Sequence, residues 1–574
     1  MKQAEKSEDA VNLKNNIPAF LIEAENAITT GDSEKAENLL SENAAEKICE
    51  FRDNASKILS LYMFSTLLYK IRQLDRAEKW NKKILEYGQY VFAYYELSKI
   101  YQERCDFITA VEYANKALSL KPKDPKILST LGKELITIGK TDEGINMLRQ
   151  AIELSPDDKD TATTILYSLH YKPDIAPQTL FQEHLQLSKT YTSAITVRTN
   201  HNNSPEPDRK LRIGYVSPNF NQHSVAYFFE PVLESHDRNK FEIYGYNNSQ
   251  ETDKVTKRMR PQFNTFRDIY NLTDEQTAEI IAQDKIDILV DLAGHTSNNR
   301  LSVFAIKPAS IQVTWLGYPD TTGLPQMDYR ITDELADPPC CHKYYTEKQI
   351  CLPCGFLCYR PPDFAPPLSA CPHIKNGFIT FGSFNINAKI NSTVMALWAQ
   401  ILKRIENSRL LLKIRGGQHP QMQEYYYRSF EQLGIQKDRI EIHGHKSPAE
   451  HLAMYGKIDI GLDTFPYQGT TTTCEALWMG IPVISLTGEY HCSRVSLSLF
   501  KRLDMSFLAV SSQQEYITKA CVLAANQESL AKIRATMRQR MMASNICDKT
   551  KFTTNLENAY RKMWHTRCDK YQNR

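Results

Sequence analysis

The chain has 574 residues, which at roughly 100–200 residues per domain predicts three or four domains or lobes. Hydrophobic residues make up 42% and charged residues 24%, the ordinary usage of a globular protein. Lys plus Arg total 70 against 67 for Asp plus Glu, so the strong basic excess of a dedicated nucleic-acid binder is excluded. No apolar run reaches the roughly 18–20 residues that span a bilayer, and residues 1–14 are polar where a signal peptide is apolar. We therefore expect a cytoplasmic protein with no membrane or nucleic-acid partner.

A 34-residue repeat occupies much of the first third of the chain. Residues 92–125 and 126–159 align in register, and a looser copy lies at residues 74–85. Four pairs match at this offset: Leu97 and Leu131, Ala117 and Ala151, Pro122 and Pro156, Asp124 and Asp158. This is the tetratricopeptide period, with small residues where paired helices touch and proline after the second helix. We predict such repeats over residues 51–160, after helices and a degenerate repeat in residues 1–50. The array either holds a protein or peptide partner or braces the next domain.

A helical linker is predicted over residues 161–205, and the pattern then changes to strands alternating with helices. A first set of strands is expected at residues 211–217, 241–246, 286–294 and 311–319. After a proline-rich boundary, a second set is expected at residues 377–384, 409–416, 439–444, 459–465 and 482–488. This alternation indicates parallel sheets covered by helices on both faces. The predicted fold class is α + α/β: a helical solenoid, then two doubly wound Rossmann-like lobes at residues 206–372 and 373–545, then a helix at residues 546–574.

Ligands of such sheets bind beyond the carboxyl ends of the strands, so the expected site is the cleft between the lobes. No strand is followed by G-x-G-x-x-G or by a P-loop, which disfavours a nicotinamide enzyme or a P-loop nucleotidase. Acidic residues near the strand ends are typical of turns and caps, so no metal is expected.

The segment DTFPYQGTTTTCEALWMG, residues 463–480, is the most informative. A strand ends at Asp463, and Gly469 with Thr470–Thr473 then opens a helix. Free N–H groups, hydroxyls and the positive end of the helix dipole make a site suited to a pyrophosphate. Glu475, one turn further, suits the hydroxyls of a ribose. The alternative is that the threonines only cap the helix.

Further candidates lie in loops that follow strands. Lys389 stands between a strand and a helix, where its charge suits a leaving phosphate. His223 follows the first strand of the first lobe, His184 lies on the helix before the polar, proline-containing segment at residues 201–210, and both suit acid–base work. His295 and Arg300 follow the strand at residues 286–294. Taken singly, each of these side chains also fits a purely structural role.

A cysteine-rich stretch raises the alternative of a structural zinc site. Cys351 and Cys354 have the spacing of half a zinc site, and Cys340, Cys341, His342 and Cys358 lie nearby. A standard second ligand pair is missing, so we do not expect zinc there.

At these motifs the sequence resembles the O-linked N-acetylglucosamine transferase and SPINDLY family, as a short-repeat member of bacterial type. The resemblance spans roughly residues 175–565 and rests on five stretches: LRIGYVSPNFNQHSV, DILVDLAGHTSNNR, IQVTWLGYPDTTGLPQMDYRITDELADPP, FGSFNINAKI and LDTFPYQGTTTTCEALWMGIPV. It implies two lobes of the GT-B type and a metal-independent, inverting transfer of one sugar from a nucleotide sugar to Ser or Thr of proteins. No cofactor is implied.

The resemblance also implies roles for individual residues. The catalytic candidates are His223, His184 and Lys389. The implied nucleotide-sugar-binding set is Lys389, His451, Gly469, Thr470, Thr471, Thr472, Glu475, His295, Arg300 and Gly317. Asn219, Ile386 and Ala388 depart from the family pattern, which bears on fine recognition of the donor more than on the reaction class.

The donor and the reaction leave alternatives open. UDP-N-acetylglucosamine is favoured as donor, with GDP-fucose close behind. A repeat adaptor with a degenerate transferase domain is disfavoured because Lys389, His223 and Glu475 all occur with the threonines. A sugar-nucleotide epimerase would leave the repeats unexplained.

Overall fold

The computed structural model describes residues 17–572, so the predicted lack of a signal peptide in residues 1–14 lies outside the described part. The chain forms two compact units. The first comprises Met1–Ile138 and His419–Met422, and the second Gly139–Gln418 and Gln423–Arg574. Within residues 17–572, no helix is both long enough and apolar enough to cross a bilayer.

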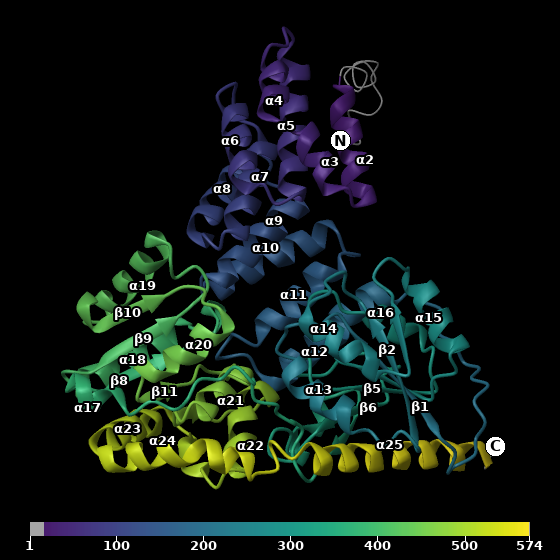
Figure 1. The fold of residues 1–574 in the computed structure, drawn as a ribbon, viewed down its shortest axis with the longest axis vertical. Coiled ribbons are helices and arrows are strands. Elements are labelled where there is room, and N and C mark those ends of the chain that lie inside the picture. Colours follow the sequence, from purple (N-terminus) through teal and green to yellow (C-terminus); the bar gives the residue numbers. More distant parts are fainter. Residues whose placement is uncertain (1–16, 573–574) are drawn as a thin grey trace. The chain divides into compact units, whose positions relative to one another are not determined.

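The first unit is an array of helices, purple to blue in Figure 1. Its helices are α2 (Ala19–Thr30), α3 (Ser33–Leu39), α4 (Glu42–Cys49), α5 (Asn54–Lys70), α6 (Leu74–Leu85), α7 (Val91–Glu103), α8 (Phe107–Leu120) and α9 (Pro125–Thr137). The repeat formed by α7 and α8 has four fully buried alanines, Ala93, Ala110, Ala114 and Ala117. Alanine fits these positions because a side chain larger than a methyl group would force the paired helices apart. The carboxylate of Asp124 caps α9 by accepting hydrogen bonds from the amides of Lys126 and Ile127. The predicted helical solenoid is confirmed.

The second unit opens with three helices, α10 (Thr141–Leu154), α11 (Lys159–Leu169) and α12 (Pro177–Thr192). A seven-stranded parallel sheet follows, in the order β3-β2-β1-β4-β5-β6-β7. Its elements are β1 (Leu211–Ser217), α13 (Ala226–Ser235), β2 (Phe241–Asn247), α14 (Lys254–Met259), β3 (Thr265–Asp268), α15 (Asp274–Gln283), β4 (Ile288–Asp291), α16 (Leu301–Ile306), β5 (Ile311–Thr314), β6 (Tyr329–Thr332) and β7 (Lys348–Cys351). Residues of β1, β4 and β5 are almost entirely buried, as expected of strands covered on both faces.

The second lobe is built on a six-stranded parallel sheet in the order β10-β9-β8-β11-β12-β13. Its elements are α17 (Pro372–Asn376), β8 (Thr380–Ser383), the 3-10 turn η3 (Asn387–Lys389), α18 (Ser392–Arg404), β9 (Arg409–Lys413), α19 (Pro420–Gln432), β10 (Ile440–His443), α20 (Pro448–Met454), β11 (Ile460–Leu462), α21 (Thr471–Trp478), β12 (Val483–Leu486), the 3-10 turn η6 (His491–Ser493), α22 (Val495–Lys501), β13 (Ala509–Val510), α23 (Gln513–Ala525) and α24 (Gln527–Met542). The two parallel sheets confirm the predicted pair of Rossmann-like lobes.

The last helix, α25 (Lys549–Gln572), returns to the first lobe, where Figure 1 shows it as the yellow helix running toward the C-terminus. Leu556, Tyr560 and Trp564 join the buried cluster formed by the strands of the first sheet. The chain therefore passes between the lobes twice, once through the segment before α17 and once before α25. The two passages meet where the amide of Tyr359 donates a 2.7 Å hydrogen bond to the carbonyl of Ile546.

Candidate functional site

The candidate residues lie just after the strands at which the strand order of each sheet reverses. In the second lobe, β8 and β11 are neighbours although β9 and β10 lie between them in the chain. In the first lobe, β1 and β4 are neighbours in the same way. Lys389 follows β8 and the threonines follow β11, whereas His223 follows β1 and His295 with Arg300 follows β4. Such switch points are where open α/β sheets bind ligands.

Lys389 ends the short turn η3 and is partly buried. Its Nζ donates a 2.8 Å hydrogen bond to the carbonyl of Gln468 and lies 3.9 Å from the centroid of the Tyr467 ring. Loss of contact with water lowers the pKa of Lys389 to about 8, although the carboxylate of Asp463 opposes this shift. The ammonium has two further N–H bonds to offer to an anion.

The loop before α21 is fixed from within the protein. The Oδ1 atom of Asp463 accepts the amide of Gly469 at 2.8 Å, and burial raises the pKa of this carboxyl group. A Cβ atom at Gly469 would collide with the hydroxyl groups of Thr472 and Thr473, so the close approach of the backbone requires glycine. No side chain caps the helix at Thr470, which leaves the first-turn amides and the positive end of the dipole available to an anion.

A buried acid–base pair lies beside this helix start. Nε2 of His451 is 3.0 Å from Oε2 of Glu475, and the rings of Phe384 and Tyr455 flank the imidazole at 5.6 and 5.5 Å. The hydroxyl of Tyr455 also donates to the carbonyl of Thr472 at 3.1 Å. The structure therefore brings His451 and Glu475 together on the same side of the second lobe as the threonines.

His184 is fully buried in the first lobe, and both of its ring nitrogens have partners. Nδ1 lies 2.7 Å from the carbonyl of Leu180, and Nε2 lies 2.8 Å from the hydroxyl of Tyr318. Burial lowers the pKa of His184, and it lowers the pKa of the neighbouring His295 to about 3. Both imidazoles are therefore neutral at pH 7, and neither is exposed to solvent.

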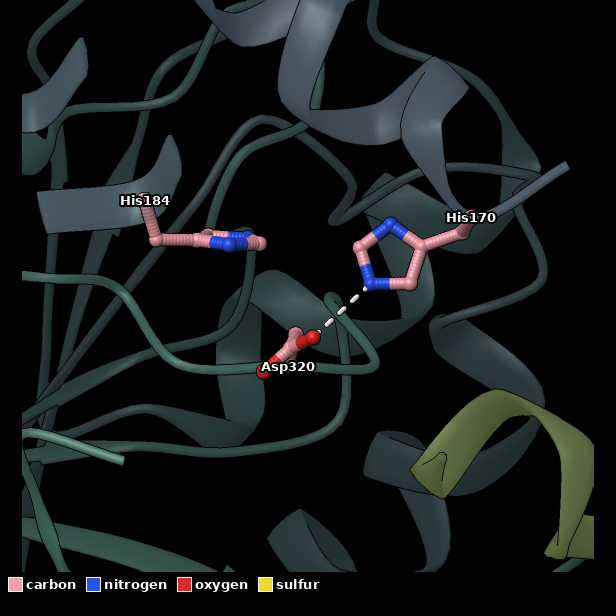
Figure 2. A group of neighbouring side chains, drawn as sticks. All are labelled: His170, His184 and Asp320. Carbon is pink, nitrogen blue, oxygen red and sulfur yellow. Dashed lines mark hydrogen bonds and ion pairs between the residues drawn. The ribbon is translucent and has the colours of Figure 1, made fainter. Parts of the chain in front are cut away.

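His170, from the turn after α11, lies beside His184, as Figure 2 shows. Its Nε2 lies 3.0 Å from Oδ2 of Asp320, and its Nδ1 lies 3.0 Å from the carbonyl of Leu166. Both nitrogens of His170 thus lie beside oxygen atoms of other residues. Although burial opposes it, the imidazoles of His184 and His170 hold the pKa of Asp320 below its usual value.

His223 is exposed and borders a cavity of about 390 Å³, which Tyr227, Val255 and Phe364 also line. Its Nδ1 accepts a 3.2 Å hydrogen bond from the amide of Val225, so the neutral ring carries its proton on Nε2. Partial burial lowers the pKa of His223, which keeps the ring neutral at pH 7.

Arg300 and Gly317 occupy structural positions in the first lobe. The guanidinium of Arg300 donates to a carboxylate oxygen of Asp274 at 2.7 Å and to the carbonyls of Ile269 and Leu272. A Cβ atom at Gly317 would collide with the main chain at Leu292. The predicted residues therefore form two groups: one around Lys389 and α21, and one in the loops of the first lobe.

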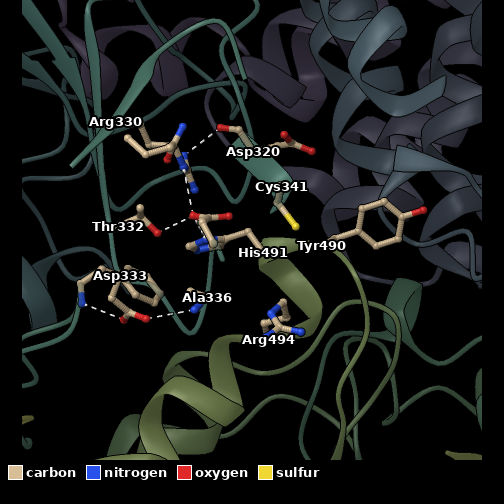
Figure 3. A network of polar contacts seen from close by, with 12 residues as sticks. Asp320, Arg330, Thr332, Asp333, Ala336, Cys341, Tyr490, His491 and Arg494 are labelled. Carbon is tan, nitrogen blue, oxygen red and sulfur yellow. Dashed lines mark hydrogen bonds and ion pairs between the residues drawn. The ribbon is translucent and has the colours of Figure 1, made fainter. Parts of the chain in front are cut away.

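An ion network joins the two lobes, and Figure 3 shows Arg330, Thr332 and His491, which surround its central carboxylate. That carboxylate is Asp337, which lies 2.7 Å from Nδ1 of His491 and 3.7 Å from Nε of Arg330. Although burial opposes it, His491 and Arg330 keep the pKa of Asp337 well below its usual value. The contact fixes η6 of the second lobe against the first.

Three residues near Lys389 and Glu475 were not predicted from the sequence: Tyr467, Gln468 and Lys413. Gln468 is fully buried, and its amide is bonded to the carbonyls of Leu486 and Ser493 at 2.8 and 2.7 Å. Lys413 ends β9, and burial lowers its pKa while Glu475 partly restores it. A charged residue at the end of a buried strand was the available signal for Lys413, and an aromatic residue inside a ligand loop was the signal for Tyr467.

Two groups of side chains within residues 17–572 have the spacing of metal ligands: His170, His184 and Asp320, and Cys371, His373 and Asp459. Neither includes a cysteine of the 340–358 stretch. Cys354 and Cys358 instead belong to the apolar core of the first lobe. All 13 cysteines are free thiols.

Comparison with known proteins gives a consistent picture. The model of glycosyl transferase family 41 matches residues 164–360 and 372–556, and a tetratricopeptide repeat model matches residues 93–124 and 125–158. Tomato and barley proteins, both named probable UDP-N-acetylglucosamine--peptide N-acetylglucosaminyltransferase SPINDLY, are 38% identical over 427 residues and 40% identical over 425. Each alignment covers 73% of this chain but 45% of the relative, so the chain spans a little under half the length of these relatives.

A solved structure extends the similarity over most of the chain. A mutant of the Thermobaculum terrenum O-GlcNAc transferase is 34% identical, with a TM-score of 0.84. The match covers 91% of this chain and all of the other.

Proposed function

Because the chain belongs to glycosyl transferase family 41, we propose that it transfers a single sugar from a nucleotide sugar to Ser or Thr hydroxyls of proteins. The proposal rests on the position of Lys389 beside the loop that leads into the uncapped start of α21, beyond the ends of β8 and β11. A cation and a helix N-terminus together suit a diphosphate.

The donor lies against the second lobe in this proposal. Lys389 and the amides around Thr471 and Thr472 hold the diphosphate. Glu475, oriented by His451, accepts hydrogen bonds from the ribose hydroxyls. Lys413, half-buried near Glu475, adds a second positive charge beside the nucleotide.

The acceptor hydroxyl attacks the anomeric carbon from the face opposite the diphosphate, so the configuration inverts. The new C–O bond forms as the bond to the diphosphate oxygen breaks, negative charge develops on the leaving group, and the proton of the acceptor hydroxyl passes to an oxygen of the departing diphosphate. Lys389 and the dipole of α21 stabilise that charge in a site with little water, and this is the largest catalytic contribution. Because the chain's own residues supply the positive charge, we propose that no metal or other cofactor takes part.

In this proposal His223 and His184 have positioning roles: His223 toward a substrate and His184 toward a loop of the protein. His223 lines the cavity, and its Nε2–H is the hydrogen-bond donor of the neutral ring, because Nδ1 already accepts the amide of Val225. His184 holds the hydroxyl of Tyr318 through Nε2 and has no free nitrogen. We therefore assign His223 to binding a sugar or acceptor oxygen and His184 to fixing the loop that contains Tyr318, rather than assigning either as the general base.

We propose UDP-N-acetylglucosamine as the donor, supported by the names of the plant relatives and of the solved transferase. The repeats suit a protein acceptor, since short helical arrays present peptide-binding surfaces. The free state of all 13 cysteines supports action in a reducing compartment, the cytoplasm.

Thermal unfolding with UDP, GDP, UDP-N-acetylglucosamine and GDP-fucose tests the donor, because a bound ligand raises the melting temperature by linkage. The expected shift occurs with UDP and UDP-N-acetylglucosamine, and a shift with the guanine nucleotides alone would replace the donor by GDP-fucose. Mass spectrometry of a Ser/Thr peptide incubated with the donor then tests transfer. Donor turnover without an acceptor would indicate an epimerase, and no binding of any of the four ligands would indicate an adaptor.

A further inference from the structure

We propose that Tyr467, supported by Tyr167 and Tyr171, is a positioning residue that holds the ammonium of Lys389 for the diphosphate. The inference rests on the proposed function and names a determinant of the same site. The supporting tyrosines come from α11 and the turn after it, in a part of the chain that precedes both lobes.

Two consecutive loop residues hold the lysine. Its Nζ lies 3.9 Å from the centroid of the Tyr467 ring, within the range of a cation–π interaction. The same Nζ donates at 2.8 Å to the carbonyl of Gln468, whose side chain is fully bonded inside the second lobe. The ring and the carbonyl fix where the ammonium stands and leave its remaining N–H bonds for the ligand.

The Tyr467 ring is itself held in place. Its hydroxyl is 3.2 Å from the hydroxyl of Tyr167, and the Tyr171 ring stacks on it with centroids 5.7 Å apart at an interplanar angle of 27°. His170 contacts it edge-on at 6.3 Å. With neighbours on several sides, the ring cannot turn away from Lys389 without disturbing the end of α11.

The end of α11 is in turn tied to the first lobe. His170 is bonded to Asp320 at 3.0 Å, and its ring packs against Tyr318 at 5.5 Å. The contacts therefore run from the first lobe through α11 to the loop of the second lobe that holds the lysine. The docking of α11 becomes a condition for the correct placement of Lys389.

A purely structural role for Tyr467 predicts a different response from a positioning role. Packing depends on the size and shape of the ring, whereas attraction to the ammonium depends on the negative charge of its face. Fluorine withdraws that charge with little change in size. A fluorination series therefore separates the two roles.

The experiment replaces Tyr467 in the full chain by phenylalanine carrying zero, one, two or three fluorines. For each variant, kcat and KM are measured with UDP-N-acetylglucosamine and a Ser/Thr peptide, and the Kd of UDP is measured by calorimetry. We expect Tyr467→Phe to keep most of the activity, and log kcat/KM to fall in proportion to fluorine number, with about a tenfold loss at three fluorines. The Kd of UDP should rise along the same series.

The matched control is the same series at Tyr427 on α19, a ring that lies under the ammonium of Lys437 at 4.6 Å and has no part in the proposed site; it should give a flat response. A flat response at position 467 would overturn the proposal, as would an equal slope at position 427. If the unsubstituted protein binds UDP but transfers no sugar, the proposed function fails and the Kd series still decides the role of Tyr467. If it binds no UDP, both proposals fail.

Discussion

The ionisation of Lys389 leads to a specific pH dependence. Burial lowers its pKa to about 8, and only the protonated form stabilises a leaving diphosphate. With that pKa, about 90% of the free protein carries the ammonium at pH 7 and about 10% at pH 9. We therefore expect kcat/KM for the nucleotide sugar to fall above a limb near pH 8, about tenfold for each further pH unit. The limb in kcat should lie at higher pH, because the bound diphosphate favours the charged lysine.

Two substitutions of Lys389 distinguish the effect of its positive charge on the rate from the effect of its titration on the pH profile. In Lys389→Arg the guanidinium stays charged throughout this range, so the alkaline limb should vanish even if the changed geometry lowers the overall rate. In Lys389→Ala the charge is lost at every pH, and kcat should drop by about 10²–10³, the usual loss when one stabilising donor is removed. Initial rates of sugar transfer to a peptide between pH 6 and 10, at saturating and at low donor, give both profiles.

Lys532→Arg, at an exposed position on α24, is the control and should reproduce the unsubstituted profile. The reasoning fails if the alkaline limb persists in Lys389→Arg, because another group would then be titrating. It also fails if Lys389→Ala keeps full kcat with saturating donor.

Three further substitutions test the donor site, the ion network and the last helix. Glu475→Gln should raise the KM for donor about 10–100-fold with little change in kcat, the loss expected for a charged hydrogen bond to ribose; an unchanged KM would contradict this role. Asp337→Asn should lower the free energy of unfolding in urea by about 3–5 kcal/mol at neutral pH, because it leaves the buried guanidinium of Arg330 uncompensated. Since the folded-state pKa of Asp337 is depressed, its contribution is present above its unfolded pKa, about 3.9, and is lost as the pH falls further; a pH-independent deficit would disagree. Leu556→Ala should lower the free energy of unfolding by about 2–5 kcal/mol, whereas Asn558→Ala on the exposed face of α25 should change it little; equal effects would argue against a shared core.

The elements that the sequence predicts well depend on local periodicity. Ala110 and Ala117 mark the helix contacts of a repeat because hairpin packing demands small residues at fixed intervals, and both are fully buried. The strands of both lobes appear as short apolar runs between helices. Lys389 and Thr471 could be singled out because each follows a predicted strand, which is a statement about position that needs no tertiary contacts.

The remaining features depend on contacts between residues far apart in the chain. His170 and Asp320 are 150 positions apart, and Tyr167 and Tyr467 are 300 apart. Nothing in the sequence around Tyr167 distinguishes it from an ordinary core residue. The complete burial of His184 was equally hidden, because a polar residue in an amphipathic helix gives no sign of what covers it.

The return of α25 to the first lobe has a consequence for the order of folding. Trp315 at the end of β5 stacks on Phe552 of α25, and the hydroxyl of Tyr215 in β1 meets that of Tyr560. The first lobe is synthesised early, yet part of its apolar core stays uncovered until residues 549–572 have left the ribosome. Until then the whole sequence of the second lobe is available for folding, whereas the first lobe still lacks α25. The later lobe can therefore fold before the earlier one, whose apolar core is completed only when the last helix docks.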